Sequence, residues 1–275
     1  MSKLHYSRSQ ITIWSKLPWW LITLAGIGVI FCWQFFTNDT YQRILLMLSG
    51  GIWVTIYVTF LAFFIATLVG LFIALAGFSK HRPIREFARF YVEFLRGVPV
   101  LVLLFYIAFV GAPQLVEFYN FLLQKPIEWQ WIETARTRDF SMTWRAIMAL
   151  SVAYSAFIAE VFRAGIQSVD QGQIEAAKAL GLKSWERFRL IILPQALRNI
   201  FPPLANDFIS MVKDSALVSA LGVQDITQLG KLHSASSFQF FETYNVVAFL
   251  YLSLTITLSL LVRFIEYSLN QNRRY

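Results

Sequence analysis

Charged residues are scarce in this chain of 275 residues. Asp, Glu, Lys and Arg make up 15% of it and hydrophobic residues 57%, whereas an ordinary soluble domain is about 25% charged. The formal net charge of +8 does not indicate nucleic acid binding, because apolar runs of about 20 residues separate the basic residues. We therefore expect an integral membrane protein whose basic residues lie beside the membrane surface and which has no nucleic acid partner.

Cysteine and histidine are too few for redox or metal chemistry. The lone cysteine, Cys32, has no partner for a disulfide and no neighbouring thiols for a metal. The histidines His5, His81 and His233 are far apart, and none has a second ligand at helical spacing. We expect no metal site and no cofactor in this chain.

Long apolar runs, in contrast, are plentiful. About 20 helical residues cross the hydrocarbon core of a bilayer. The sequence predicts six transmembrane helices, at about 18–36, 50–78, 99–118, 143–166, 200–222 and 244–265. The fold class is therefore an all-α integral membrane protein.

The first apolar run is preceded by basic residues and so resembles a signal peptide. Its exit, "FCWQFFTND", lacks the small-residue cleavage site of such a peptide, and we expect it to stay as a membrane span. Lys and Arg outside the six spans gather in alternate connecting segments, beginning with the N-terminal one. Because basic residues accumulate on the cytoplasmic side, both termini are predicted to be cytoplasmic.

The fifth predicted span is unusually polar, since it carries Asn206, Asp207, Lys213 and Asp214. Facing lipid, each charge would cost a few kcal/mol. Residues seven apart share a helix face, so Asn206 lies under Lys213 and Asp207 under Asp214 in two adjoining stripes. One interpretation is a translocation path, and the other is a helix packed inside the bundle with its charges paired among themselves.

The fourth predicted span holds Glu160 and Arg163 near its cytoplasmic end. Residues three apart can pair on one helix face. A structural ion pair and a substrate contact are both open for Glu160.

A charged, helix-forming segment follows on the same predicted side, "QGQIEAAKALGLKSWERFRLIILPQALRN". Its first helix is expected to end at Gly181, where glycine suits a left-handed cap. Ser184 is expected to cap a second helix that ends before Pro194. The strip Ile174, Ala177 and Leu180 indicates a docking surface, and the alternative is a helix lying on lipid headgroups.

The pattern "EAAKALG", nine residues and "IILP" resembles the EAA signature of the permeases of ABC importers. "AFIAEVFRAGIQSVDQGQIEAAKALGL", "PQALRNIFPPLANDFISMVKDSALVS" and "EFLRGVPVLVLLF" are similar to the polar amino acid uptake permeases within that group. The likeness covers roughly residues 48–268. It implies a type I importer core of five helices at 48–268 with a cytoplasmic coupling loop at 167–199. Residues 1–47 would then add a cytoplasmic N-terminus and an extra helix, and 269–275 a cytoplasmic tail.

This resemblance implies a function and partners. The chain would carry a polar amino acid across the bacterial plasma (inner) membrane by alternating access. It would pair with a second permease chain, the same or homologous, and receive the amino acid from an external binding protein. Two ATP-binding cassette ATPase subunits would bind ATP and Mg²⁺. This chain has no phosphate-binding loop of its own, because in the most similar stretch, residues 181–184, glycine and lysine do not have the spacing of that motif.

The same resemblance assigns roles to residues. The coupling helix would insert into a groove of the ATPase, and the signature residues are Glu175, Ala176, Ala177, Leu180, Gly181, Leu182 and Pro194. Glu175 would meet a basic residue of the ATPase, and Gly181 would set the angle between the two short helices. The candidates for the substrate path are Glu160, Asn206, Asp207, Lys213 and Asp214.

Two other functions would also place polar residues in membrane spans. A secondary transporter or a channel for a small polar solute would need no EAA segment, so association with an ATPase separates these classes. A membrane-embedded enzyme would use Glu160 with Asp207 or Asp214 as an acid–base pair, but no nucleophile, ligand set or glycine-rich loop accompanies them.

Overall fold

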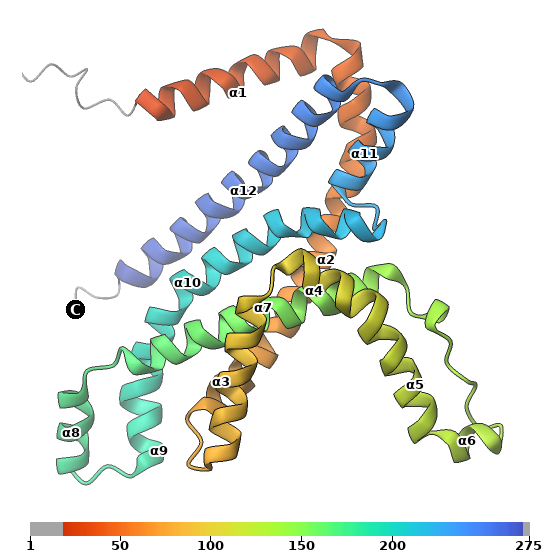
Figure 1. The fold of residues 1–275 in the computed structure, drawn as a ribbon. Coiled ribbons are helices and arrows are strands. Elements are labelled where there is room, and N and C mark those ends of the chain that lie inside the picture. The colour runs from red at the N-terminus through yellow and green to blue at the C-terminus, as the bar shows by residue number, and fades with distance from the viewer. Residues whose placement is uncertain (1–18, 272–275) are drawn as a thin grey trace, which may run out of the picture.

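In a computed structural model, which describes residues 19–271, the chain is all helical, and that part contains no strand. The bounds of the longer helices are α1 Trp19–Thr37, α2 Asp39–Gly77, α3 Arg82–Gly97, α5 Ala112–Leu122, α7 Met142–Gln167, α10 Leu193–Asp214, α11 Ile226–Ser237 and α12 Phe240–Gln271. Figure 1 shows their arrangement.

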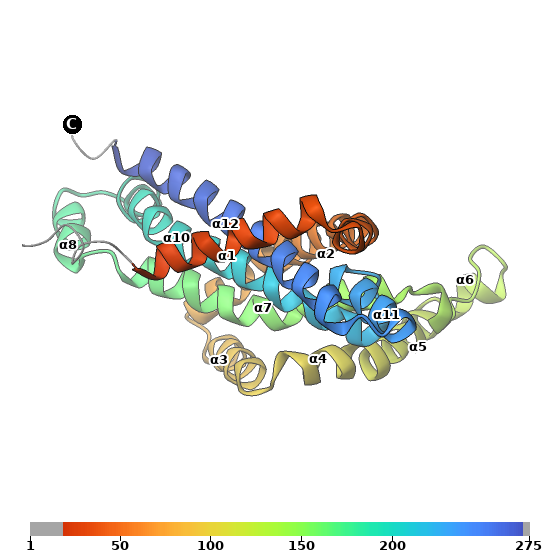
Figure 2. The same ribbon diagram turned by 90° about the horizontal axis from the view of Figure 1, so that it is seen from above.

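Shorter helices connect these elements. They are α4 Val100–Tyr106, the π-helix η2 Ile107–Gly111, α6 Gln124–Glu128, the 3₁₀-helix η3 Thr137–Asp139, α8 Gln171–Ala179, α9 Ser184–Arg187, the π-helix η4 Phe188–Ile192 and the 3₁₀-helix η5 Ser215–Leu221. In both ribbon views α8 and α6 lie at opposite ends of the molecule (Figures 1 and 2). One end therefore carries the segment that follows α7, and the other carries the loop that precedes it.

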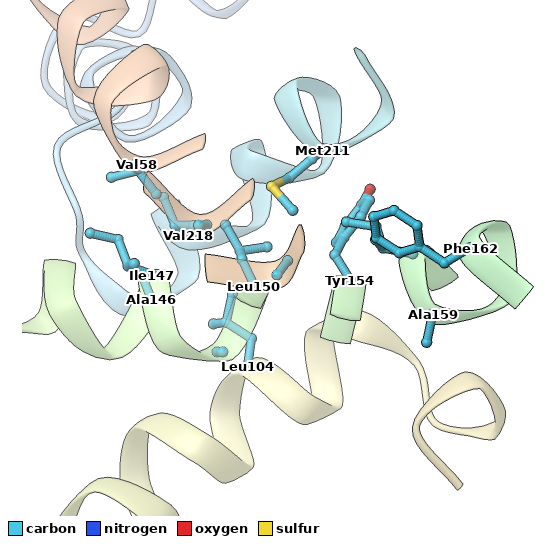
Figure 3. Packing of buried hydrophobic residues seen from close by; sticks show 14 of the residues in the cluster. Val58, Leu104, Ala146, Ile147, Leu150, Tyr154, Ala159, Phe162, Met211 and Val218 are labelled. Carbon is cyan, nitrogen blue, oxygen red and sulfur yellow. The ribbon is translucent and has the colours of Figure 1, made fainter. Parts of the chain in front are cut away.

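The core lies where α7 packs between α2, α10 and the 3₁₀-helix η5. Ile147 and Leu150 of α7 are fully buried in it beside Val58 of α2, Met211 of α10 and Val218 of η5 (Figure 3). In the most apolar part of α7, 72% of the residues are buried, against 33% for α2. This helix is thus the inner element of the bundle, and α2 shares its surface between protein and lipid.

A glycine sets the distance between α7 and α10. A Cβ atom on Gly165 would lie 2.2 Å from Cγ1 of Ile200, so only glycine permits this approach of the two helices. The contact lies near the cytoplasmic end predicted for α7, immediately before the segment that leaves the bundle.

Four stretches of the described residues are long and apolar enough to cross a membrane: Asp39–Gly77, Val100–Leu122, Met142–Gln167 and Phe240–Tyr267. They match the second, third, fourth and sixth predicted spans. The second begins earlier than predicted because Asn38 caps α2, its Oδ1 accepting from the Thr40 N–H at 2.9 Å.

The other two predicted spans differ from the expectation. The first corresponds to α1, of which only Gly26–Phe35 forms a shorter apolar stretch, and residues 1–18 lie outside the described part. The fifth is a helix from Leu193 to Asp214, but it changes to the 3₁₀-helix η5 at Ser215 and is not among the four apolar stretches. Its polar residues, Asn206, Asp207, Lys213 and Asp214 among them, make it less apolar than those stretches.

At the far end of α7, Arg145 is buried and fastens the connecting loop. Its guanidinium donates to the carbonyls of Phe140 at 2.9 Å, Ala108 at 3.1 Å and Thr137. The charge is thus stabilised by carbonyl dipoles. Because Ala108 belongs to η2, Arg145 holds together α7, the loop and the apolar stretch Val100–Leu122.

Candidate functional site

The segment between α7 and α10 folds as the glycine pattern predicts. Asp170 caps α8, its Oδ1 accepting from the Gln173 N–H at 3.1 Å. At the other end Gly181 has φ +81°, and its N–H donates to the Lys178 carbonyl at 3.0 Å while the Leu182 N–H donates to the Ala177 carbonyl at 3.1 Å. This pair of bonds is a Schellman cap, which requires the left-handed conformation that glycine adopts freely.

The second helix of the segment differs from the prediction in two ways. Its cap is Lys183, not Ser184, and Glu186 Oε2 accepts from the Lys183 N–H at 2.7 Å. It also does not end before Pro194, because α9 passes through the π-helix η4 directly into α10. Pro194 then stands directly after the π-helical turn, inside a continuous helical run, and it supplies no N–H to a carbonyl of the preceding turn.

Fewer residues of the α8 region are exposed than the predicted docking strip Ile174, Ala177 and Leu180 requires. Leu180 is 82% exposed, and Glu175 and Ala176 are exposed beside it. Ala177 is only 3% exposed, and Ile174 packs against the main core. Of the strip predicted as a docking surface, only Leu180 is thus exposed in the single chain, because Ile174 and Ala177 hold α8 against the bundle.

Two hydrogen bonds join the segment to α10. Gln195 Nε2 donates to Gln173 Oε1 at 2.6 Å, and Asn199 Nδ2 donates to Ser168 Oγ at 2.8 Å. The first bond joins α8 to α10, and the second joins α10 to the end of α7. A displacement of α8 would therefore reach α10 directly and α7 through α10.

A cavity of about 420 Å³, hereafter the α7–α10 cavity, lies next to this junction. It brings together two of the predicted path residues, Glu160 and Asp207, and adds Arg96 from α3. The rest of its lining is Phe157, Val161, Ala164, Gly165, Ser168, Asn199 and Pro203. Within the described part of the chain the buried Oδ2 of Asp207 has no hydrogen-bond partner. The cavity thus contains an acidic oxygen that can accept from a bound cation.

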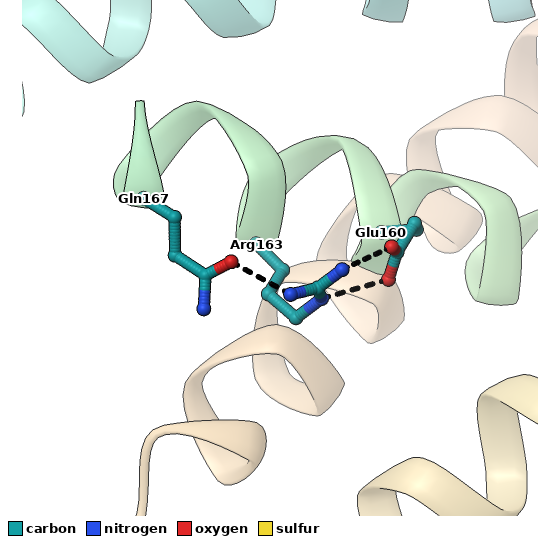
Figure 4. A network of polar contacts seen from close by, with 3 residues as sticks. All are labelled: Glu160, Arg163 and Gln167. Carbon is teal, nitrogen blue, oxygen red and sulfur yellow. Dashed lines mark hydrogen bonds and ion pairs between the residues drawn. The ribbon is translucent and has the colours of Figure 1, made fainter. Parts of the chain in front are cut away.

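Glu160 is held by Arg163, which is one of the two interpretations that the sequence left open. Arg163 Nε donates to Glu160 Oε2 at 2.9 Å, its Nη2 pairs with Oε1, and its Nη1 donates to Gln167 Oε1 at 2.7 Å (Figure 4). The pair is half exposed, with 43% of the Arg163 and 32% of the Glu160 side chain accessible. Such bidentate geometry fixes the orientation of the carboxylate.

The two predicted stripes on α10 are separated in the structure. Asn206 and Lys213 are exposed, whereas Asp207 and Asp214 are half-buried. Asp214 accepts a hydrogen bond from the Tyr154 hydroxyl at 2.7 Å. Among residues 19–271 none of the four forms an ion pair, so the interpretation in which these charges neutralise one another is not supported.

Several residues of this region were not predicted from the sequence. Arg96 lies over the ring of Phe157, 5.7 Å from its centroid, and a lone cation just before an apolar run was the available signal. Ser168, Asn199 and Tyr154 gave none, since their partners are distant in the sequence. In the described part of the chain no group of three His, Cys, Asp or Glu residues is arranged to hold a metal ion.

Comparison with known proteins decides the family. Residues 66–275 match the model of the family described as "Binding-protein-dependent transport system inner membrane component". The chain belongs to this family. It is therefore a multi-pass component of the inner membrane, which agrees with its apolar helices.

Individual relatives of this inner-membrane component align over most of its length. The "Probable amino-acid permease protein YxeN" of Bacillus subtilis is 35% identical over 221 residues, which cover 80% of this chain and 90% of that protein. The "Arginine transport system permease protein ArtQ" of the same organism is 30% identical, covering 81% and 92%.

Solved structures agree with the sequence relatives. A chain in the "Crystal structure of an amino acid ABC transporter with histidines" is 35% identical, with a TM-score of 0.69 over 85% of this chain and 98% of that one. A chain of the MetNI methionine ABC transporter in an inward-facing conformation is 20% identical, with a TM-score of 0.61, and supports the fold alone.

Proposed function

We propose that the chain is the permease subunit of an ATP-driven importer for a polar amino acid. It is not itself an enzyme, because family members are permeases and a partner subunit hydrolyses ATP. Relatives of 30–35% identity are named for amino acids or arginine, and the similar solved structure is an amino acid ABC transporter. These relatives support the substrate class.

The proposed topology has six spans and both termini in the cytoplasm. Residues 48–268 form the importer core with the coupling loop at 167–199, residues 1–47 add the N-terminus and an extra helix, and 269–275 form the tail. The Phe35 ring of α1 lies 4.6 Å from that of Phe249 of α12, which supports an added helix packed beside the core. The polar α10 completes the count, because Asp207 lines a cavity and Asp214 accepts a hydrogen bond from Tyr154, so that neither carboxylate needs to face lipid.

The coupling role depends on one observation above all: Leu180 and Glu175 stand exposed on a capped helix that is hydrogen-bonded to α10. An exposed leucine on a rigid corner suits the groove of an ATPase subunit. Glu175 would pair there with a basic residue, with Ala176 beside it. Gly181, Leu182 and Pro194 shape the corner, and Ala177 supports it from inside.

The assembly that follows contains two ATPase subunits, a second permease chain and an external amino acid-binding protein. ATP and Mg²⁺ are bound by the ATPases, whose affinity for nucleotide differs between the two conformations of the transporter. Only such a difference in affinity can shift the equilibrium between inward-open and outward-open states.

The α7–α10 cavity is the proposed part of the substrate path. Asp207 and Glu160 would receive the ammonium of the amino acid and Arg96 its carboxylate. Pro203 lacks an N–H, so the carbonyl of Asn199 receives no helical hydrogen bond and is a further acceptor. Asn206, Lys213 and Asp214 do not line this cavity and are proposed to act elsewhere along the same path.

A reconstitution tests this function. The chain, co-purified from its native membrane with its partners, is placed in vesicles, and ATP hydrolysis is measured with each amino acid and its binding protein. We expect the ATPase to be stimulated by one or a few polar amino acids. Uptake that proceeds without any ATPase subunit would instead assign the chain to the secondary transporters or channels.

A further inference from the structure

A second cavity lies on another side of α7. It has a volume of about 340 Å³ and is bordered by the end of α2, by α3 and by α7, with the exposed Arg89 and Glu93 at its open side. Its lining residues are Ile73, Ala74, Gly77, Phe78, Ala88, Arg89, Val92, Glu93, Ala159, Glu160, Arg163 and Gln167. Its size falls in the range of about 300–1,000 Å³ that ligand cavities have. We refer to it as the α2–α3–α7 cavity.

The two cavities share one charged residue. Glu160 lines both, whereas Asp207 and Arg96 line only the α7–α10 cavity, and Arg163 and Gln167 line only the second one. Positions 160, 163 and 167 lie on one face of α7. Glu160 therefore stands at the edge between the two cavities, and Arg163 approaches it from the second.

Charges of both signs balance in the α2–α3–α7 cavity. Arg89 and Glu93, four residues apart on one face of α3, are accompanied by Arg163 and Glu160 of α7. The α7–α10 cavity, in contrast, has Glu160 and Asp207 against Arg96. A balanced lining suits a ligand that carries both charges.

Each side of the cavity has a charged group with bonding capacity left. Among the described residues Glu93 forms no ion pair, and Arg89 pairs only at 3.6 Å with the exposed Glu86. Arg163 uses its Nε and one N–H of each terminal nitrogen on Glu160 and Gln167, which leaves further N–H donors.

We propose that the α2–α3–α7 cavity binds a second molecule of amino acid. The carboxylate of the ligand is held by Arg163 and Arg89, and its ammonium by Glu93. The choice of an amino acid rests on the proposed function, since a zwitterionic lipid headgroup presents the same pair of charges. A free amino acid is favoured because the proposed substrate path, the α7–α10 cavity, lies on the other side of Glu160.

Occupancy of this cavity affects the substrate path through Arg163. A ligand carboxylate on the remaining N–H donors of Arg163 weakens the attraction of that guanidinium for Glu160, and Glu160 then becomes freer to meet an ammonium in the α7–α10 cavity. The two sites are thus coupled, and coupling of this kind typically changes affinity by about fivefold or more.

Binding stoichiometry provides the test. The complete permease–ATPase complex is placed in nanodiscs of phosphatidylglycerol, and the binding of radiolabelled arginine, glutamine and histidine is counted per permease chain. The variant is Glu93→Gln, and the matched control is Glu86→Gln, which alters an exposed carboxylate of the same helix outside the cavity. We expect two molecules of one amino acid per chain in the native and Glu86→Gln proteins and one in Glu93→Gln.

The outcomes are separable. One molecule per chain in all three proteins, or two in Glu93→Gln, overturns the proposal. Addition of phosphatidylethanolamine should displace the second amino acid from the native protein and should not change binding to Glu93→Gln. This result confirms the cavity as a site for zwitterions. Phosphatidylethanolamine that binds at Glu93 without any second amino acid assigns the cavity to lipid and overturns the proposal. Uptake by Glu93→Gln, measured in parallel, reports on the proposed transport function independently.

Discussion

The coupling segment and the α7–α10 junction, although adjacent, are built by different means. The junction is buried and closely packed, with Gly165 against Ile200 and no room for one more carbon. The segment is exposed, and its shape comes from backbone hydrogen bonds, from caps at Asp170 and Gly181, and from a few side-chain bonds to α10. Changes in the junction should therefore damage the folded chain, whereas changes in the segment should damage transport alone.

The largest effect is expected for Gly165→Leu. The new side chain would overlap Ile200 and force α7 and α10 apart, because packed cores do not accommodate added volume cheaply. We expect loss of the folded chain from the membrane fraction, measured by fluorescence-detected size-exclusion chromatography. Gly77→Leu, at a position with nothing within 4 Å, is the control and should be retained. Normal yield of Gly165→Leu would contradict the packing described here.

Gly181→Val comes next. Valine at φ +81° is strained by about 1–3 kcal/mol, and the Schellman cap should open. We expect uptake to be lost while the chain inserts and keeps its elution profile, because a Cβ at this position meets no other atom. Gly181→Asn, which tolerates the left-handed conformation better, should retain more uptake than valine. Equal loss in both variants would remove the conformational explanation.

Glu175→Lys should also abolish uptake. The change reverses the charge at an exposed position, so any attraction to a basic residue of the ATPase becomes repulsion. We expect the ATPase to dissociate or to hydrolyse ATP without transport, measured by pull-down and vesicle uptake. Glu186→Gln controls for loss of charge elsewhere in the segment. Full transport by Glu175→Lys would rule out a coupling role for this residue.

The smallest effect is expected for Asp214→Asn. Its amide oxygen can still accept from the Tyr154 hydroxyl, so the fold should survive while the charge on the path is lost. We expect a several-fold change in transport with normal ATPase assembly, and a comparable change for Lys213→Met. Loss of ATPase in the pull-down would show that these residues support assembly instead.

The sequence predicted those parts of the structure that depend on neighbouring residues. The left-handed glycine at 181 and the Glu160–Arg163 pair follow from residues within one or two helical turns, and the EAA signature gave the family. The burial of the Ala177 side chain depends on packing against the bundle, and the partners of Arg96 and Asn199 come from distant parts of the sequence. No local pattern contains that information. Pro194 misled because a proline is compatible with a continuing helix when a π-helical turn precedes it.

The burial of α7 has a consequence for how the protein is made. Much of the surface of this helix contacts other helices, and Arg145 near its start is satisfied only by carbonyls of the folded protein. As an isolated segment in lipid it would leave that guanidinium without these partners, at a cost of a few kcal/mol. Since α2 is synthesised first and offers the complementary surface, α7 gains its stable position in the bilayer by associating with a helix already there. Its biogenesis is thus a step of assembly as much as of insertion.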